Sequence, residues 1–279
     1  MRRLTTAELF KLTHRRMTWI LATTLLVLTG VVYTVILIRV QNGGNPDRPD
    51  ELARFTQFLS LTNVVPFGYS VTQQLVTILG IVLAGAAVGS EFGWRTVLLI
   101  TAWTGARVRL VAAKLLVLAL LVAAGVLLGF VASLTGSILA GLVRGSLQGS
   151  AWSSSLLPHA LAGGGRTWLA VLPYVFLAGA LAMLGRSTTL GVAVGLAVLF
   201  LERVVGPLVG LLGHPFDNLQ NVFLYRNAGG LMQANGLLPG ADSSAGMPSP
   251  VHGAVVLLLY VALFAGITFL AFMHRDLTE

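Results

Sequence analysis

Residues 89–114 read GSEFGWRTVLLITAWTGARVRLVAAK and lie between two long apolar segments of the chain. The charged side chains in this stretch are Glu91, Arg95, Arg107, Arg109 and Lys114, although charged residues make up only 10% of the protein. Because a charged side chain at the centre of a bilayer costs several kcal/mol, the stretch must lie outside the hydrocarbon. We therefore expect a cytoplasmic loop of a membrane protein that contains a short helix.

The composition of the whole chain agrees with a membrane protein. The 279 residues are 56% hydrophobic and have a mean hydropathy of +0.84. Soluble domains usually carry a charge on roughly a quarter of their residues. The net charge of +8 would suggest a nucleic-acid partner in a soluble protein. Here Lys and Arg on the cytoplasmic side explain it, so no nucleic-acid partner is expected.

Length and hydropathy predict six membrane-spanning helices within a single transmembrane domain over residues 1–279. The expected spans are residues 17–40, 64–89, 110–142, 167–184, 188–205 and 251–273. The third apolar run is longer than a bilayer requires, and the sequence leaves open whether it projects or breaks near Gly136. An even number of spans places both termini on one side, and the basic N-terminus indicates the cytoplasm. The expected fold class is an all-α membrane protein.

Three segments between the spans carry further expectations. Residues 1–16 read as an amphipathic helix on the membrane surface, preceding the first span without the cleavage site of a signal peptide. Thr5 and Glu8 fit a capping box at the start of this helix. Residues 144–166 contain three consecutive glycines, which is typical of an outer loop. Residues 206–250 alternate short apolar runs with Pro, Gly and Ser, which indicates an extracellular insertion with short helices dipping into the outer leaflet.

Several kinds of chemistry are excluded by the residue pattern. The only lysines, Lys11 and Lys114, are each followed by Leu, so neither belongs to a phosphate-binding loop. The histidines lack helical metal-ligand spacing and cysteine is absent, so no metal site is expected. No Ser lies in a nucleophile-elbow motif. We therefore expect no enzyme activity and no cofactor on this chain.

A few polar residues lie inside the expected spans. Gln73 and Gln74 fall within the second span, where amides either pack at a helix interface or line a wet path. Glu202 is the only carboxylate inside an expected span. Its place near the outer end argues against a proton-coupled carrier, which needs an acid at mid-depth. The neighbouring Arg203 is expected to neutralise it.

The order of residues after the second span resembles the ABC-2 type permeases, the membrane subunits of one class of ABC transporters. An acidic residue, Glu91, is followed by Gly93, Trp94, Arg95 and Thr96, then by an aliphatic helix and the basic residues Arg107 and Arg109. Bacterial multidrug and bacitracin-resistance exporters use such subunits. Residues 7–12, AELFKL, resemble the interfacial elbow helix at the start of that family. Many relatives carry Pro where this chain has Ala102, Trp103, Thr104 and Gly105, which leaves the end of the short helix open.

The resemblance implies a function for the charged stretch. Residues 91–109 would be a cytoplasmic coupling loop that docks on an ATP-binding cassette subunit, with contacts from Glu91, Gly93, Trp94, Arg95, Thr96, Arg107 and Arg109. The partner would hold Mg-ATP, and the permease would pair with a second copy or with a homologous permease. A substrate path would run along the second and fifth spans, past Gln73 and Gln74. The location implied is the bacterial inner membrane.

The leading hypothesis is therefore a permease subunit that exports a hydrophobic or amphiphilic substrate. One alternative is a non-transporting sensor or anchor in an ABC-like assembly, with residues 206–250 as its outer part. A second alternative is an ion-coupled secondary carrier. Transport that depends on ATP distinguishes the first hypothesis from the other two.

Overall fold

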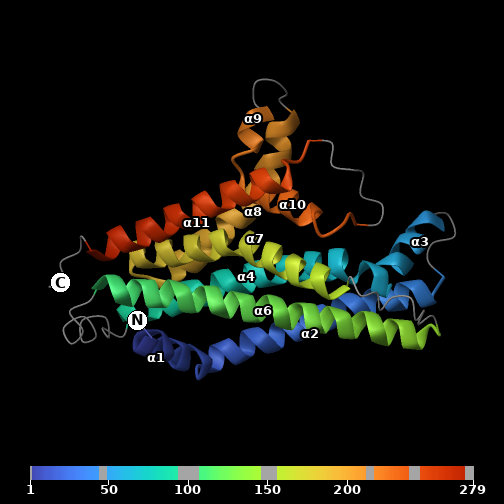
Figure 1. The fold of residues 1–279 in the computed structure, drawn as a ribbon, viewed down its shortest axis with the longest axis horizontal. Coiled ribbons are helices and arrows are strands. Elements are labelled where there is room, and N and C mark those ends of the chain that lie inside the picture. Colours follow the sequence, from blue (N-terminus) through green and yellow to red (C-terminus); the bar gives the residue numbers. More distant parts are fainter. Residues whose placement is uncertain are drawn as a thin grey trace.

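The computed structural model describes residues 2–43, 49–93, 107–145, 156–211, 217–238 and 246–273. Every regular element in these ranges is a helix (Figure 1). The elements are α1 (Arg2–Thr13), α2 (Arg16–Gln41), α3 (Pro49–Phe58), a 3₁₀ turn (Leu61–Asn63), α4 (Val64–Gly93), α6 (Arg107–Val143), α7 (Leu156–Gly185), α8 (Thr188–Leu211), α9 (Asp217–Gln220), α10 (Leu224–Gln233) and α11 (Pro250–Met273).

Six of these helices are long and apolar enough to cross a membrane: α2, α4, α6, α7, α8 and α11. The expected fold class, an all-α protein with six spans, is confirmed. Helix α6 has 37 residues and continues through Gly136 without a break. At about 1.5 Å per residue it exceeds the ~30 Å hydrocarbon core. The long third helix is therefore longer than the hydrocarbon core alone requires.

Helices α4 and α7 form the centre of the bundle. They pack more extensively on each other than any other pair of helices. Val171, Tyr174 and Val175 of α7 are almost completely buried, as is Ile81 of α4. Helices α2, α8 and α11 lie at the periphery, where many of their large apolar side chains are exposed. Exposed apolar surface of this extent is what spans in contact with lipid require.

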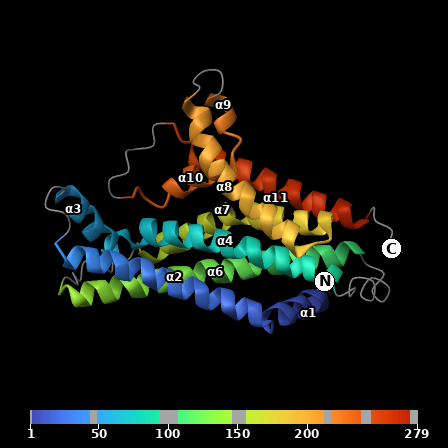
Figure 2. The same cartoon turned by 180° about the vertical axis from the view of Figure 1, so that it is seen from behind.

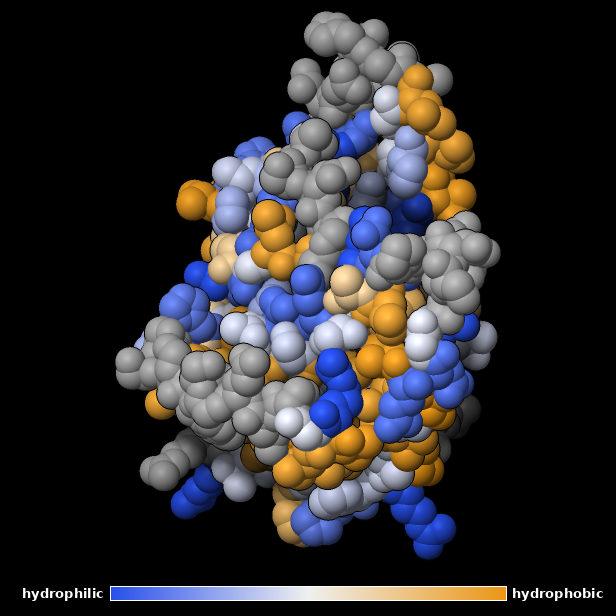
Figure 3. Space-filling view, turned by 90° about the vertical axis from the view of Figure 1, so that its right-hand side faces the viewer, coloured by the Kyte–Doolittle hydropathy of each residue, from blue (hydrophilic) through white to orange (hydrophobic). Residues whose placement is uncertain are grey.

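The two ends of the bundle carry different elements. Helix α1 and the end of α11 lie at one end, and α3 lies at the opposite end (Figures 1 and 2). Helix α8 leans away from the bundle, so that α9 lies at the tip of a projection and α10 returns against α11 and α7. Figure 3 looks onto the α3 end, where hydrophilic side chains are interspersed with hydrophobic ones.

The glycine run at residues 163–165 is helical and does not form a loop, so the expectation of an outer loop there is wrong. Helix α7 begins at Leu156 and includes all three glycines. The hydroxyl of Tyr69 on α4 donates a hydrogen bond to the carbonyl of Ala160 at 2.6 Å. A Cβ atom at Gly163 would lie 2.7 Å from Tyr69 Cε2. The glycine is needed because the tyrosine ring lies directly against the α7 backbone.

The expected capping box at Thr5 and Glu8 is also wrong. Helix α1 begins at Arg2, so Thr5 lies inside the helix and is not its N-cap residue. Glu8 is buried, and its carboxylate faces Lys11 of the same helix and Lys114 of α6. That α1 acts as an interfacial elbow helix stays a prediction.

Candidate functional site

Both lysines of the chain meet at the carboxylate of Glu91. Lys11 Nζ lies 2.5 Å from Glu91 Oε1, and Lys114 Nζ donates a hydrogen bond to the same oxygen. Glu8 completes the group, with its Oε2 3.6 Å from Lys114 Nζ and its Oε1 3.9 Å from Lys11 Nζ. These four residues are called the four-charge cluster below. They join α1, the last turn of α4 and the beginning of α6.

Three of the four residues in the four-charge cluster are buried, and the Lys11 side chain is 30% exposed. Glu8, Glu91 and Lys114 expose only 6%, 5% and 4% of their surface. The two carboxylates and two ammonium groups cancel in charge, which is the condition for holding ionised groups in a buried place. Removing one partner of such a group is strongly destabilising, because an uncompensated charge is left behind. The cluster therefore fixes α1, α4 and α6 at one spacing.

Further hydrogen bonds hold the bend between α1 and α2. Arg15 lies between the two helices, and its Nη1 donates to Ser90 Oγ at 3.0 Å, next to the cluster. The Thr18 hydroxyl donates to the Leu12 carbonyl at 2.6 Å, and Trp19 Nε1 donates to the Thr13 carbonyl at 2.9 Å. These bonds cross from α2 back to α1. Helix α1 is thus attached to the start of the first span and to the end of the second.

The expected coupling residues fall into two groups. Gly93 is the last residue of α4, Arg107 is the first residue of α6, and the Arg109 side chain is exposed. Trp94, Arg95 and Thr96, together with the expected short helix at residues 96–104, lie outside the described residues. Lys114 follows Arg107 by about two helical turns. Both ends of the expected coupling loop are therefore next to the four-charge cluster.

A second polar site lies where α8 meets α10. Tyr174 on α7 donates its hydroxyl to Glu202 Oε2 at 2.8 Å. The backbone N–H groups of Leu224 and Tyr225 donate to the two Glu202 oxygens at 3.1 and 3.2 Å. These amides form the first turn of α10, where helix N–H groups lack intrahelical acceptors and the helix dipole favours negative charge. Glu202 therefore caps α10 from another helix.

The expectation that Arg203 neutralises Glu202 is wrong. Within the described residues no ion pair joins the two side chains, and the Glu202 carboxylate is bound by Tyr174 and by α10. Adjacent residues on a helix point about 100° apart and do not face each other.

The other end of α10 carries the opposite charge. Arg166 on α7 donates from Nη1 to the Ala234 carbonyl at 2.9 Å and to Asn235 Oδ1 at 3.0 Å. Ala234 is the C-cap residue of α10, and a cation at a helix C-terminus interacts favourably with its dipole. We refer to Glu202, Tyr174 and Arg166 as the α10 clamp. It binds one short helix to two spans.

Comparison with known families identifies the architecture. The family model described as "ABC-2 family transporter protein" matches residues 4–202 of the chain. The chain belongs to the ABC-2 family of transporter proteins. This permease is thus the membrane subunit of an ABC transporter, and the resemblance seen in its sequence is confirmed. No curated protein matches the chain. The matched region contains the whole four-charge cluster and extends to Glu202, whereas α10 and α11 lie beyond it.

The amides expected to line a path lie on α4 of the permease. Gln74 is exposed and Gln73 is half-buried. In the view of Figure 2, α4 is visible between α2 and α8. Among the described residues, no three His, Asp or Glu side chains lie close enough together to hold a metal ion.

Four residues of these two polar sites are not predicted as site residues from the sequence: Glu8, Lys11, Tyr174 and Arg166. The contact between Lys11 and Glu91 joins residues 80 positions apart, and helical periodicity cannot predict such a pairing. One signal was available in the sequence. Lys11 and Lys114 are the only lysines among the 18 Lys and Arg residues, and both belong to the four-charge cluster.

Proposed function

We propose that this permease exports a hydrophobic or amphiphilic substrate and is driven by a separate ATP-binding cassette subunit that holds Mg-ATP. Membership of the ABC-2 family supports the ATP-binding partner. Two permeases, identical or homologous, form the membrane part of the transporter. The transporter lies in the bacterial inner membrane, and both termini of the permease face the cytoplasm. The placement of α1 and the end of α11 at the same end of the bundle supports a common side for the two termini, and the basic N-terminus favours the cytoplasm.

The four-charge cluster is the observation that supports coupling at residues 91–109. The loop begins at the end of α4 and finishes at the start of α6. The four-charge cluster joins these two helices to each other and to α1. A push on the loop by the ATP-binding subunit would then move three helices together as a rigid body, in place of bending the loop. The contacts with the ATP-binding subunit are made by Trp94, Arg95, Thr96 and Arg109. Glu91 has the different role of holding the loop to the bundle from inside.

The substrate path runs along the face that α4 and α8 share at the pairing of two permeases. Gln74 is exposed on α4, and Phe200, Leu201 and Val204 of α8 are exposed large apolar residues. A mostly apolar surface with an occasional amide suits an amphiphilic substrate, because the amide can bond to one polar group while the rest stays in hydrocarbon. Membrane lipids cover the remaining apolar surface.

Co-expression with the ATP-binding subunit tests this proposal. Deleting residues 96–104, or making the double change Arg95→Glu and Arg109→Glu, should abolish co-purification of that subunit and ATP-driven transport into inverted vesicles. Glu91→Gln should lower the stability of the permease, but the folded fraction should still bind the subunit and transport less substrate per ATP hydrolysed, since docking survives and transmission does not. Arg144→Glu, at the opposite end of α6, is the matched control and should change neither quantity.

Two results would overturn the proposal. Assembly and transport that survive the deletion of residues 96–104 would exclude coupling through this loop. A stable complex that hydrolyses ATP but moves no substrate under any condition would favour the sensor or anchor function instead. In both cases size-exclusion chromatography of the variant establishes that the permease itself is folded.

A further inference from the structure

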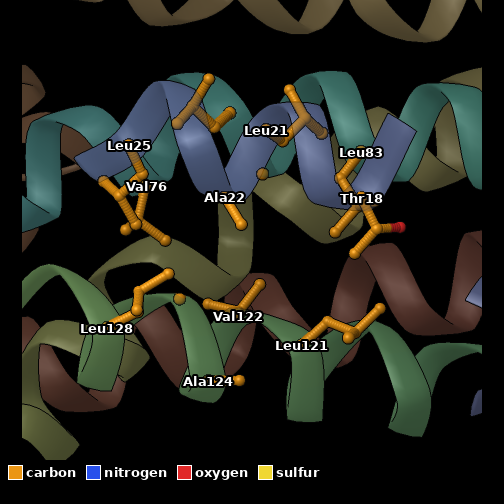
Figure 4. A pocket seen from close by; sticks show the side chains of 13 residues that line it. Thr18, Leu21, Ala22, Leu25, Val76, Leu83, Leu121, Val122, Ala124 and Leu128 are labelled. Atoms are coloured by element: carbon orange, nitrogen blue, oxygen red, sulfur yellow. The ribbon is translucent and has the colours of Figure 1, made fainter. Parts of the chain in front are cut away.

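A narrow apolar cleft of about 150 Å³ lies between α2, α4 and α6. Each helix contributes a stretch of similar length to its walls, residues 18–25 of α2, 76–83 of α4 and 121–128 of α6. Figure 4 shows the side chains of α2 and α6 on opposite sides of this space. A rise of about 1.5 Å per residue makes the cleft roughly 10 Å long, parallel to the helices. That length is about a third of the ~30 Å hydrocarbon core.

The cleft lies in the leaflet next to α1. Trp19, which is 68% exposed at the start of α2, marks the membrane interface, because Trp concentrates at the level of the headgroups. Its ring nitrogen bonds back to Thr13 of α1, which fixes it at that level. Thr18 forms the end of the cleft nearest this interface, and Leu25 lies farther along α2. The cleft therefore begins near the headgroups and extends into the hydrocarbon.

The mouth of the cleft is continuous with the surface that faces lipid. Ala124 of α6 lines the cleft and is itself exposed. Leu120 and Leu127 lie one turn to either side of Ala124 and are 49% and 65% exposed. The small side chain of Ala124 therefore leaves a gap in a row of leucines that faces lipid. Ala22 of α2 lines the opposite wall (Figure 4).

The apolar side chains that line the cleft favour a hydrocarbon occupant. Thr18 is the only lining residue with a polar side chain, and its hydroxyl already donates to the Leu12 carbonyl at 2.6 Å. A buried water needs about two to four polar partners, and apolar cavities of about this volume stay dry and take up molecules such as benzene. An empty cleft would lose the dispersion contacts of its walls. Acyl chains are the hydrocarbon that the bilayer supplies at this depth.

We propose that this cleft is a binding site for the acyl chain of a phospholipid from the leaflet next to α1. The chain fills the gap between α2 and the other two helices and so packs a peripheral span onto the bundle. This role depends only on the permease spanning a bilayer. It therefore stands or falls separately from coupling to ATP.

The test uses a phosphatidylcholine with a photoactivatable diazirine in its acyl chain, mixed into vesicles that hold the full permease. After irradiation, peptide mass spectrometry should find adducts concentrated at residues 18–25 and 121–128, above the density on the exposed Val255, Leu258, Leu259 and Leu263 of α11. Ala22→Phe fills the cleft and should lower the adducts there by about tenfold, the ratio that ~1.4 kcal/mol of lost binding free energy produces. Ala262→Phe, the same change at an exposed position of α11, should leave cleft adducts unchanged.

A second measurement covers the case in which Ala22→Phe folds poorly. Stripping lipid with detergent should lower the melting temperature of the wild type, and adding back phosphatidylcholine should restore it. Ala22→Leu, a smaller filling, should reduce this dependence on lipid. Labelling at the cleft no denser than on α11, or unaffected by both fillings of Ala22, would overturn the proposal. A dependence on lipid equal in wild type and Ala22→Leu would also count against it.

Discussion

Glu202 and Arg166 lie on different spans and hold opposite ends of the same helix. The Glu202 carboxylate accepts hydrogen bonds from the backbone N–H groups of Leu224 and Tyr225, at the start of α10. The Arg166 guanidinium donates a hydrogen bond to the carbonyl of Ala234, the C-cap residue of the helix. Each charge thus lies at the end of α10 where the helix dipole favours it. A helix of ten residues is too short to be stable by itself in water. The α10 clamp therefore explains why this helix is ordered against α7, α8 and α11.

Glu202→Gln should loosen the start of α10. The amide nitrogen of Gln cannot accept the hydrogen bonds that one carboxylate oxygen now accepts, so a buried N–H or hydroxyl loses its partner at a cost of about 1–3 kcal/mol. Hydrogen exchange of the permease in nanodiscs should become faster in residues 224–228. Asp50→Asn, an exposed acid on α3, should not change this exchange. Unchanged exchange in Glu202→Gln would show that the cap contributes little.

Arg166→Gln should loosen the other end of α10. The amide of the shorter Gln side chain does not extend as far as the Arg166 Nη1 that now donates to Ala234 and Asn235, and the favourable charge at the helix C-terminus is lost. These contacts together contribute about 1–2 kcal/mol. Exchange should rise first in residues 231–235, whereas Glu202→Gln acts first on residues 224–228. The same exchange pattern from both variants would mean that α10 opens as one unit and that its two ends are not held separately.

The two lysines of the four-charge cluster should differ in their effect on stability. Lys114→Met leaves buried carboxylates without their most enclosed cation and should cost about 3 kcal/mol or more. The Lys11 side chain is 30% exposed, and water can replace part of its role, so Lys11→Met should cost about 1 kcal/mol. Chemical denaturation or thermal melting of the purified permease measures the loss of stability in each variant, and the loss should be larger for Lys114→Met. Equal losses would mean that burial does not set the strength of these pairs.

Neighbouring glycines of α7 provide a matched test of helix packing. A Cβ at Gly163 would lie 2.7 Å from the ring of Tyr69, whereas nothing lies within 4 Å of a Cβ at Gly165. Gly163→Ala should destabilise the permease by about 1–3 kcal/mol through overpacking. Gly165→Ala should raise stability by up to about 1 kcal/mol through helix propensity. Melting temperatures that move in the same direction would contradict the close packing of Tyr69.

Much of the architecture could be predicted because hydropathy acts locally. Every stretch that must cross about 30 Å of hydrocarbon has to be long and apolar, so six spans can be counted without tertiary information. That residues 89–114 lie outside the bilayer stays a prediction of the same kind. Hydropathy could not say what Glu91 binds, because its partners lie 80 and 23 positions away. Composition also suggested a loop at residues 163–165, since the ring of Tyr69 that requires glycine there comes from another helix.

The sequence by itself therefore determined the membrane class, the number of spans and the family. Both signals, the length of each apolar stretch and the order of residues after the second span, are local features of the sequence. Only the tertiary structure could show which charges meet. Glu91 joins both lysines, and Glu202 caps α10 in place of pairing with Arg203. The physical reason is that a charge removed from water takes whichever counter-charge or dipole the packed helices bring within a few Å. Helix packing, and not nearness in sequence, sets those distances.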